Sequence, residues 1–440
     1  MSTHKFRVRN AARAILGAAM LSAAFGAAAA DGTLLHTMFQ DHAVLQREQP
    51  IRVFGRADAG EQVKISFAGK RATARAGADG NWSAPLPPMK AGGPYALTAS
   101  VGTATQNVDD VMVGDVWLCS GQSNMELQVW RSLDARAEIS GANNDRIRLL
   151  TVPQNGAVTP QATFATPVKW TTTTPDSIRD FSAACYYFAR ELQKTVDVPM
   201  GLVNAAWGGS RIQAWISGDA LRATKRYNDE LDVLAQYATD EVGAIGRWGD
   251  VWTRWWNARS GAKPGDEPWR GDYAPGKDWR SAPRELGAWE RWGIPELSAF
   301  DGMVWYRTTI KLTARQAAQD ATLALAPADE VDMTWVNGVA VGSTYGAGSG
   351  REYALPKGLL KEGENVVVVN VLDTYRDGGL SGPASANALR FKDGSSAPLS
   401  NPWKYRMVAG SDTPPRAPWQ TPAGLSTLYN GMIAPLGRYN

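Results

Sequence analysis

Two kinds of hydrophobic pattern alternate along this chain. From about residue 34 to residue 109, short runs such as 51–54 and 63–67 alternate between apolar and polar residues. Turn-forming clusters such as 57–60 separate these runs. Alternation of this kind buries one face of a strand and exposes the other. The segment therefore predicts a small β-sandwich.

The pattern changes after residue 110. Residues 111–119 form a nearly continuous apolar run, which predicts a buried strand ended by Ser120 and Gly121. Apolar residues recur at helical spacing across 180–194, and a second buried strand is expected at 198–206, before Gly208 and Gly209. Strand, helix and strand with glycine at the strand exit is typical of an α/β layer.

The segment from residue 246 to residue 292 is rich in tryptophan. Its eight tryptophans are Trp248, Trp252, Trp255, Trp256, Trp269, Trp279, Trp289 and Trp292. Their faces suit the apolar faces of sugar rings, and an indole N–H can bind a polar partner. An equally good interpretation is that they form the core of a loop-rich region.

Strand patterns return between about residues 300 and 392. The expected strands are 303–311, 321–325, 331–336 and 366–371. The tetrapeptide Val336-Asn337-Gly338-Val339 predicts a type I′ hairpin, because Asn-Gly tolerates the positive φ angles of that turn. This region predicts a second β-sandwich inserted into the α/β part, to which residues 425–436 would return.

The fold class expected is thus a multidomain α/β plus all-β chain. Its predicted parts are a signal peptide (1–30), an N-terminal β-sandwich (31–109), the first part of an α/β domain (110–245), an inserted tryptophan-rich segment and β-sandwich (246–398), and a return to the α/β domain (399–440).

The N-terminus changes the interpretation of the charge. Residues 1–30 contain a basic stretch, an apolar run and small residues up to Ala30, the pattern of a secretory signal cleaved near Ala30 to leave Asp31 first. Without the four basic residues of this segment, the net charge of +3 falls to −1. We therefore expect a secreted or periplasmic protein with no nucleic-acid partner. No later stretch reaches the roughly 18 apolar residues of a membrane span, so no membrane association is expected after cleavage.

The chain contains only two cysteines, Cys119 and Cys185. Each lies in an apolar segment. A disulfide and a pair of buried free thiols are both compatible with the sequence, since their separation in space cannot be measured from it.

Ser123 is the leading candidate for chemistry. It follows the predicted buried strand at a glycine turn, which places it at the carboxyl end of the sheet, where open α/β sheets bind ligands. Its neighbourhood is not the G-x-S-x-G elbow of ordinary α/β-hydrolases, because Met125 replaces the second glycine. A serine in this place is also a common helix cap.

The motif G-D-V-W-L-C-S-G-Q-S-N-M-E at 114–126 resembles the first block of the sialate O-acetylesterase family, within the SGNH (GDSL-like) hydrolase superfamily. Further segments that resemble the family are M-F-Q-D-H-A-V-L-Q-R (38–47), G-L-V-N-A-A-W-G-G-S-R-I-Q-A-W (201–215) and L-Y-N-G-M-I-A-P-L (428–436). Two others, W-V-N-G-V-A-V-G (335–342) and G-E-N-V-V-V-V-N-V (363–371), are similar to its galactose-binding-like domain. The resemblance implies an SGNH-type α/β/α domain with two accessory β-sandwiches.

The resemblance also implies a carbohydrate O-acetylesterase that works through a serine acyl-enzyme. Ser123 would be the nucleophile and Gly209 an oxyanion donor, while Gln122, Asn124 and Arg211 would be neighbours in the substrate pocket. The partner would be an acetylated sugar or glycan. No cofactor or metal is implied, and the scattered histidines and cysteines form no metal-ligand pattern. Nothing in the sequence indicates an oligomeric state.

The sequence departs from the family in its acid–base residues. Family members carry the orienting Asp and the base His in a C-terminal segment that is not present in these 440 residues. The histidines are His4, His36 and His42, none at a matching position. The chain thus resembles a C-terminally truncated member, and we expect weak or no turnover. A non-catalytic carbohydrate-binding protein is the main alternative, and a glycosidase with a carboxylate pair is a weaker one.

Overall fold

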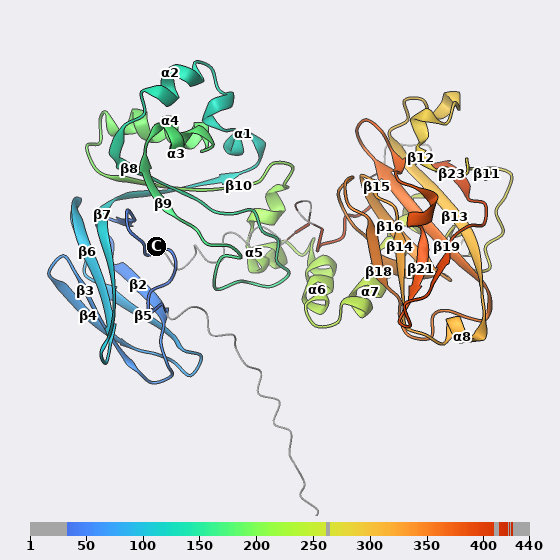
Figure 1. The fold of residues 1–440 in the computed structure, drawn as a ribbon, viewed down its shortest axis with the longest axis horizontal. Coiled ribbons are helices and arrows are strands. Elements are labelled where there is room, and N and C mark those ends of the chain that lie inside the picture. The colour runs from blue at the N-terminus through green and yellow to red at the C-terminus, as the bar shows by residue number, and fades with distance from the viewer. Residues whose placement is uncertain (1–32, 261–264, 409–412, 421, 423, 426–440) are drawn as a thin grey trace, which may run out of the picture.

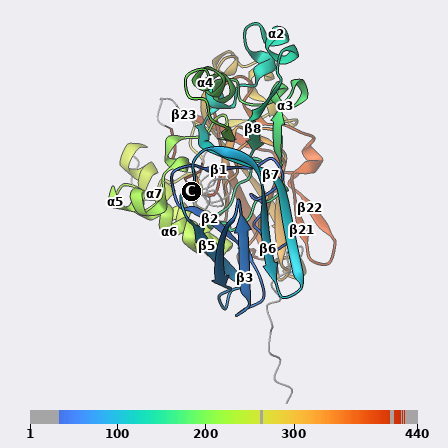
Figure 2. The ribbon, with the colours of Figure 1, turned by 90° about the vertical axis from the view of Figure 1, so that its left-hand side faces the viewer.

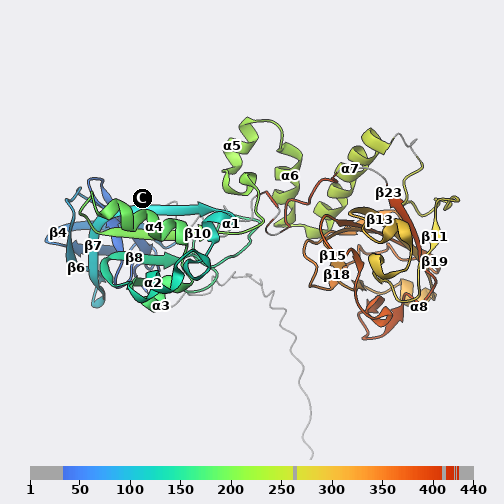
Figure 3. The same ribbon diagram turned by 90° about the horizontal axis from the view of Figure 1, so that it is seen from above.

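The computed structural model describes residues 33–260, 265–408, 413–420, 422, 424 and 425. Figure 1 shows two lobes, one built from residues 33–206 and the other from residues 265–408. Three helices lie between them, as the view from above also shows (Figure 3). They are α5 (Gly218–Ala223), α6 (Asn228–Tyr237) and α7 (Glu241–Ser260). The predicted signal peptide lies outside the described residues.

One long strand, β7 (Ala104–Gly121), runs through the whole first lobe. It belongs to an eight-stranded sheet of order β4-β3-β6-β7-β10-β8-β9, with β1 also paired to β7. The other strands are β1 (Val44–Gln46), β3 (Gln62–Phe67), β4 (Lys70–Arg75), β6 (Gly92–Val101), β8 (Asn144–Thr151), β9 (Trp170–Thr173) and β10 (Met200–Ala206). The boundary expected at residues 109 and 110 therefore falls inside a single strand.

The first half of β7 belongs to an all-β region. Here β6 pairs antiparallel with β7, and a second sheet of β2 (Ile51–Arg56) and β5 (Asn81–Leu86) faces this one. Val53, Ile65 and Trp82 are buried in the core that the two sheets share. The strands expected at 51–54 and 63–67 are thus confirmed, and a shared core between two sheets is what alternating strands produce.

The second half of β7 belongs to a parallel arrangement in which β10 pairs with both β7 and β8. Alternate residues of β10 serve two cores: Leu202 packs on the helix side, whereas Val203 packs into the core of the all-β region. The helix side is covered by α3 (Pro175–Arg179) and α4 (Ala183–Gln193), the latter close to the helix expected at 180–194 (Figures 1 and 2). In the described part, the second helical layer of an α/β/α domain is not found, because the all-β region covers that face. Short helical turns complete the lobe: α1 (Ser123–Glu126), η1 (Val129–Arg131), α2 (Ala135–Ser140) and η2 (Ile212–Trp215).

Cys119 and Cys185 form a disulfide that links β7 to α4. Their Cα atoms are 5.9 Å apart, and both residues are buried. The structure therefore decides between the two states that the sequence left open.

The second lobe is built on two facing sheets. The six-stranded sheet has the order β11-β23-β13-β19-β16-β17 and the four-stranded sheet the order β18-β14-β21-β22, with a small sheet β12-β20-β15 beside them. The strands of the six-stranded sheet are β11 (Arg280–Ser281), β13 (Gly302–Leu312), β16 (Val331–Val336), β17 (Val339–Gly342), β19 (Gly363–Asp373) and β23 (Lys404–Val408). The remaining strands are β12 (Gly287–Ala288), β14 (Ala321–Leu325), β15 (Ala328–Asp329), β18 (Arg351–Ala354), β20 (Gly379–Leu380), β21 (Ala388–Phe391) and β22 (Ser396–Pro398). Short helical turns are η3 (Trp289–Arg291), η4 (Pro295–Leu297), α8 (Ala314–Ala317) and η5 (Ala384–Ala386).

The expected strands of this lobe are all present, and so is the hairpin. β16 ends at Val336 and β17 begins at Val339, and these residues pair with each other. Asn337 and Gly338 have φ angles of 50° and 88°, as a type I′ turn requires. Residues 404–408 form β23, which pairs with β13. This part of 399–440 therefore extends the second sandwich instead of returning to the α/β layer, and residues 426–440 lie outside the described residues.

The tryptophan-rich segment forms a core, and much of it is helical. Trp248, Trp252 and Trp256 are buried on α7, which packs against the outer face of the six-stranded sheet. Trp269 stacks on Trp335 of β16, with ring centroids 4.9 Å apart and ring planes 13° from parallel. The packing interpretation therefore holds: residues 246–260 belong to α7, whereas residues 265–292 are mainly turns and loops, as expected.

The described helices include none long and apolar enough to cross a membrane.

Candidate functional site

Ser123 lies where β7 ends. Gly121 closes the strand with a φ of 142°, a backbone conformation that side chains other than glycine's rarely adopt. Gln122 is the N-cap of α1, and Ser123 is its first residue. The Ser123 side chain is exposed, and its Oγ donates a hydrogen bond of 3.1 Å to Gln122 Oε1. The hydroxyl is therefore open to a ligand from solvent.

The parallel neighbour β10 ends beside it. Ala206 pairs with Gly121, and the Trp207 N–H donates to the Gly121 carbonyl at 2.9 Å. The chain then turns through Gly208 and Gly209, and Gly209 has a φ of 78°. A Cβ atom at Gly208 would lie only 3.6 Å from Ser123 Cβ. Two parallel strand ends thus bring the serine and the glycine turn together, as expected at the carboxyl edge of a sheet.

Glu126, on the same short helix as Ser123, joins these two parts of the site. Its Oε2 accepts a hydrogen bond from the Gly208 N–H, and its Oε1 accepts one of 3.0 Å from Gln154 Nε2. Gln154 also donates to the Ala206 carbonyl at 3.3 Å. Because the Gly208 N–H is already bonded, the next N–H of the turn, that of Gly209, is the better candidate for an oxyanion donor. Sequence reasoning missed Glu126, since no local pattern identifies a partner 82 positions away.

The other predicted site residues come from two segments, one beside Ser123 and one after the glycine turn. Gln122 and Asn124 are exposed next to Ser123. Arg211 follows the glycine turn as the N-cap of η2. Its surface is exposed, yet the surrounding protein removes enough water to lower the pKa of the guanidinium, and the nearby charge of Arg416 lowers this pKa further. The segment after the glycine turn therefore lies close to Arg416, a residue that follows the last strand of the second sandwich.

The structure places His36 and His42 away from Ser123. His36 Nε2 lies 3.0 Å from the Ala162 carbonyl oxygen, and the ring packs 4.9 Å from that of Phe54. His42 Nδ1 lies 2.6 Å from Asp110 Oδ2. Asp110 lies eleven positions before the end of β7 at Gly121, a span of roughly 35 Å at about 3.3 Å per residue, and Ser123 follows that end.

His42 belongs instead to an ion cluster. The buried Arg148 donates two hydrogen bonds to the Asp110 carboxylate, at 2.8 and 3.1 Å. Hydrogen bonding to Arg148 lowers the pKa of Asp110, and the bond to His42 adds to this effect. The cluster fastens the segment before β1 to β7 and β8, so it has a structural explanation.

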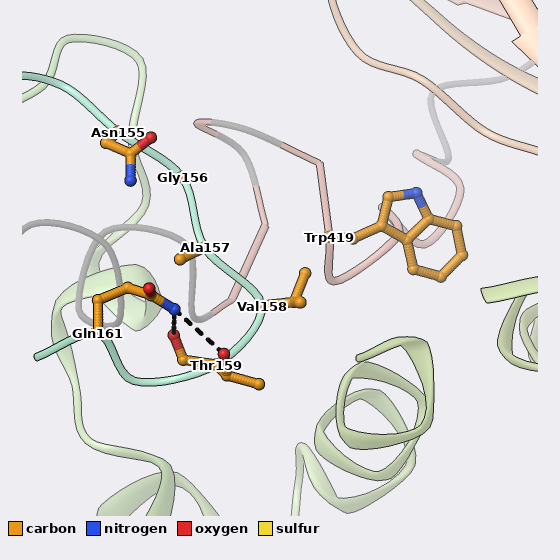
Figure 4. A pocket seen from close by; sticks show the side chains of 7 residues that line it. All are labelled: Asn155, Gly156, Ala157, Val158, Thr159, Gln161 and Trp419. Atoms are coloured by element: carbon orange, nitrogen blue, oxygen red, sulfur yellow. Dashed lines mark hydrogen bonds between the residues drawn. The ribbon is translucent and has the colours of Figure 1, made fainter. Parts of the chain in front are cut away.

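A cavity of about 380 Å³ lies between two separate segments of the chain (Figure 4). The loop of residues 155–161 lines one side, and the indole of Trp419 lines the other. The loop follows Gln154, whose bond to Glu126 places the loop's first residue beside the serine helix. Among the described residues, no group of three or more His, Cys, Asp or Glu side chains could hold a metal ion.

Comparisons with known proteins agree with this arrangement. Residues 113–246 match the family model for carbohydrate esterase, sialic acid-specific acetylesterase. Residues 303–365 match the model for the galactose-binding domain of β-galactosidase. The first match covers the serine, the glycine turn and Glu126, and the second covers strands of the second lobe.

Individual relatives carry the same descriptions. The chain is 37% identical to human sialate O-acetylesterase over 153 residues, which make up 32% of this chain and 29% of the human protein. It is 34% identical to the rat sialate O-acetylesterase over 201 residues, or 42% of this chain and 37% of the rat protein. A solved structure described as a novel carbohydrate acetylesterase from Xanthomonas citri is 41% identical, with a TM-score of 0.42 and coverage of 43% of this chain and 44% of that chain. The chain thus matches less than half the length of each of these proteins.

Proposed function

We propose that this chain, whose residues 113–246 match the family model for carbohydrate esterase, sialic acid-specific acetylesterase, is a carbohydrate O-acetylesterase with Ser123 as its nucleophile. The single observation that supports the assignment most strongly is the approach of the exposed Ser123 to the Gly208–Gly209 turn. A nucleophile and backbone donors that converge on one point are what acyl transfer requires. The substrate class is an ester of acetate with a sugar hydroxyl.

In the proposed reaction, Ser123 Oγ attacks the carbonyl carbon of the acetyl group while a base removes its proton. The tetrahedral oxyanion accepts a hydrogen bond from the Gly209 N–H. When the intermediate collapses, the bond to the sugar oxygen breaks, and the released oxygen takes up the proton. Water then attacks the acetyl-Ser123 ester, releases acetate and restores the hydroxyl.

The proposed reaction requires a base that removes the proton of Ser123. The sequence contains three histidines, and no histidine follows His42. The two described histidines are bonded elsewhere, His36 to the Ala162 carbonyl and His42 to Asp110, so we expect neither of them to act as this base.

The test is acetate release from acetylated sugars by the full chain and by Ser123→Ala. The matched control is Ser140→Ala, an exposed serine on α2 whose hydroxyl bonds only within its own helix. We expect the release to disappear in Ser123→Ala and to persist in Ser140→Ala. Equal release by Ser123→Ala and the parent would refute Ser123 as the nucleophile.

We also propose that the protein is exported. The basic and apolar segments of residues 1–30 support this, and so does the Cys119–Cys185 disulfide, because disulfides persist mainly in oxidising compartments. N-terminal sequencing of the protein from periplasm or medium should begin at Asp31. Recovery of uncleaved chain in the cytosolic fraction alone would contradict export.

A further inference from the structure

The cavity of Figure 4 has two walls that come from distant parts of the sequence. One wall is the loop that contains Asn155, Val158 and Gln161, and the other is Trp419. Figure 4 shows the Val158 side chain pointing toward the indole across the cavity. At about 380 Å³ the cavity falls within the usual range of small-molecule sites, about 300–1,000 Å³.

Each wall of the cavity is connected, through a neighbouring residue, to a segment that lies beside Ser123. Gln154, the residue before the loop, bonds to Glu126 at 3.0 Å and to the Ala206 carbonyl at 3.3 Å. On the other wall, Pro422 follows Trp419 by three residues and would lie 3.9 Å from a Cβ atom at Gly209. The cavity is therefore adjacent to the turn that faces Ser123, and a molecule held in it could present a substituent to the serine.

The lining suits a neutral hydroxylated ring. The loop contributes the amides of Asn155 and Gln161 and the hydroxyl of Thr159, and none of the lining residues is charged. Gln161 Nε2 already donates to the carbonyl (2.8 Å) and the hydroxyl (3.1 Å) of Thr159. Gln161 Oε1, the Asn155 amide and the Thr159 hydroxyl hydrogen are then the groups that can bond sugar hydroxyls. Val158 and the Trp419 indole supply apolar surface for the C–H face of a sugar ring.

Trp419 is held firmly in place. Its ring stacks on Tyr237 of α6 with centroids 4.7 Å apart and planes 18° from parallel. Its Nε1 donates to the Ser343 carbonyl at 3.1 Å. An aromatic side chain fixed before binding loses little entropy when a ligand packs against it.

We propose that this cavity is the subsite that holds the sugar ring of the substrate, and that the ring it accepts is uncharged. The inference rests on the proposed esterase function, and it adds the residues that recognise the sugar. It also specifies the substrate class, since a sugar carboxylate would have no cationic partner in this lining.

Binding can be tested without turnover. In a Ser123→Ala background, the probe is mono-O-acetylated methyl xylopyranoside, and its affinity is measured by isothermal titration calorimetry. Trp419→Ala removes one wall, whereas Val158→Arg fills the cavity from the other side and leaves the packing of Trp419 intact. The matched control is Trp130→Ala, which removes a half-exposed tryptophan of η1.

We expect the Ser123→Ala chain to bind the probe and both cavity variants to bind at least about tenfold more weakly, with no change for Trp130→Ala. Equal affinity in the cavity variants, or no binding by the Ser123→Ala chain, would overturn the subsite. Binding of N-acetylneuraminic acid in preference to the neutral probe would overturn the claim that the ring is uncharged. Thermal melting of Val158→Arg checks that the fold is kept.

The outcome is separable from the proposed esterase function. Turnover of p-nitrophenyl acetate, which carries no sugar, should be unchanged in the control Trp130→Ala and lost in Ser123→Ala. If that turnover depends on Ser123 but the cavity variants bind the sugar normally, the esterase proposal stands and the subsite does not.

Discussion

Glu126 Oε2 accepts the backbone N–H of Gly208 and so fixes the helix of Ser123 to the turn that would form the oxyanion hole. Glu126→Ala removes this bond, and a hydrogen bond to a charged group contributes about 1.5–3 kcal/mol. We expect acetate release to fall by about tenfold or more, mainly in kcat, because the donor next to Gly208 is no longer held in place. Steady-state kinetics on an acetylated sugar measure this.

Glu126→Gln is the matched control for this experiment. Its remaining oxygen can still accept the Gly208 N–H, so most of the rate should return. If the alanine variant is as active as the parent, or if only KM changes, the positioning role is wrong.

The histidines of the first lobe give a second prediction. His42 is bonded to Asp110 far along β7 from Ser123, and His36 contacts Ala162. We therefore expect His36→Ala and His42→Ala to release acetate at the parental rate per folded molecule. A drop of a hundredfold in either variant, with the melting temperature unchanged, would identify that histidine as the base.

The disulfide should contribute substantially to stability. It links residues separated by 66 positions, and a link of this kind is worth about 2–4 kcal/mol. The Cys119→Ser/Cys185→Ser double variant should lose this amount in denaturant unfolding. Dithiothreitol should lower the stability of the parent and have no effect on the double variant. Equal stability of the parent and the double variant in the absence of dithiothreitol would contradict the pairing.

The tryptophans should affect stability more than sugar binding. Trp335 is 1% exposed between Trp269 and Trp305, so Trp335→Ala should cost about 3–5 kcal/mol. Trp130 is 49% exposed, and its replacement by alanine should cost less than about 0.5 kcal/mol. Urea unfolding compares the two, and a stable Trp335→Ala protein would argue against the core assignment.

The buried carboxyl of Asp373 should make the free energy of unfolding depend on pH. Burial raises the pKa of its carboxyl to about 6, and the nearby Asp301, Asp329 and Glu290 add to the effect. Because this pKa exceeds the value of about 3.9 in an unfolded chain, the folded protein holds the proton more tightly. The stability from this group is therefore complete below about pH 4 and is lost as the pH rises through 6.

Asp373→Asn should accordingly raise the free energy of unfolding by about 1–3 kcal/mol at pH 7.5 and change it little at pH 4. The exposed Asp145→Asn is the control, with no such difference between the two pH values. An equal effect of Asp373→Asn at both pH values would contradict the raised pKa.

Local pattern was sufficient for the regular elements. The alternating runs gave β2 and β3, the helical spacing gave α4, and Asn337-Gly338 gave the hairpin between β16 and β17. These succeed because strand and helix periods and turn angles depend on residues that are neighbours in the sequence. The family resemblance, not the local pattern, implied that Ser123 and Gly209 share one site, and the parallel strands β7 and β10 do end side by side.

The pairing of strands that are far apart in the chain could not be predicted from the sequence. The change of hydrophobic pattern after residue 110 suggested a boundary, but β6 and β10 both pair with β7 and make one strand span two regions. The residues of β23 were assigned to the α/β layer, yet their backbone pairs with β13. Backbone hydrogen bonds between strands depend little on which residues the strands contain. The partner of a strand is therefore determined by how side chains pack across the whole sheet.

By itself, then, the sequence determined the strands, the exposed serine at a strand exit and the family that the serine motif resembles. Tertiary structure alone decided that Cys119 bonds to Cys185, that the tryptophans of α7 pack against a sheet, and that Glu126 and Trp419 adjoin the site. The physical reason is that each of these depends on a distance between residues far apart in the chain. Such distances are set by the summed packing of two lobes, and no local pattern encodes them.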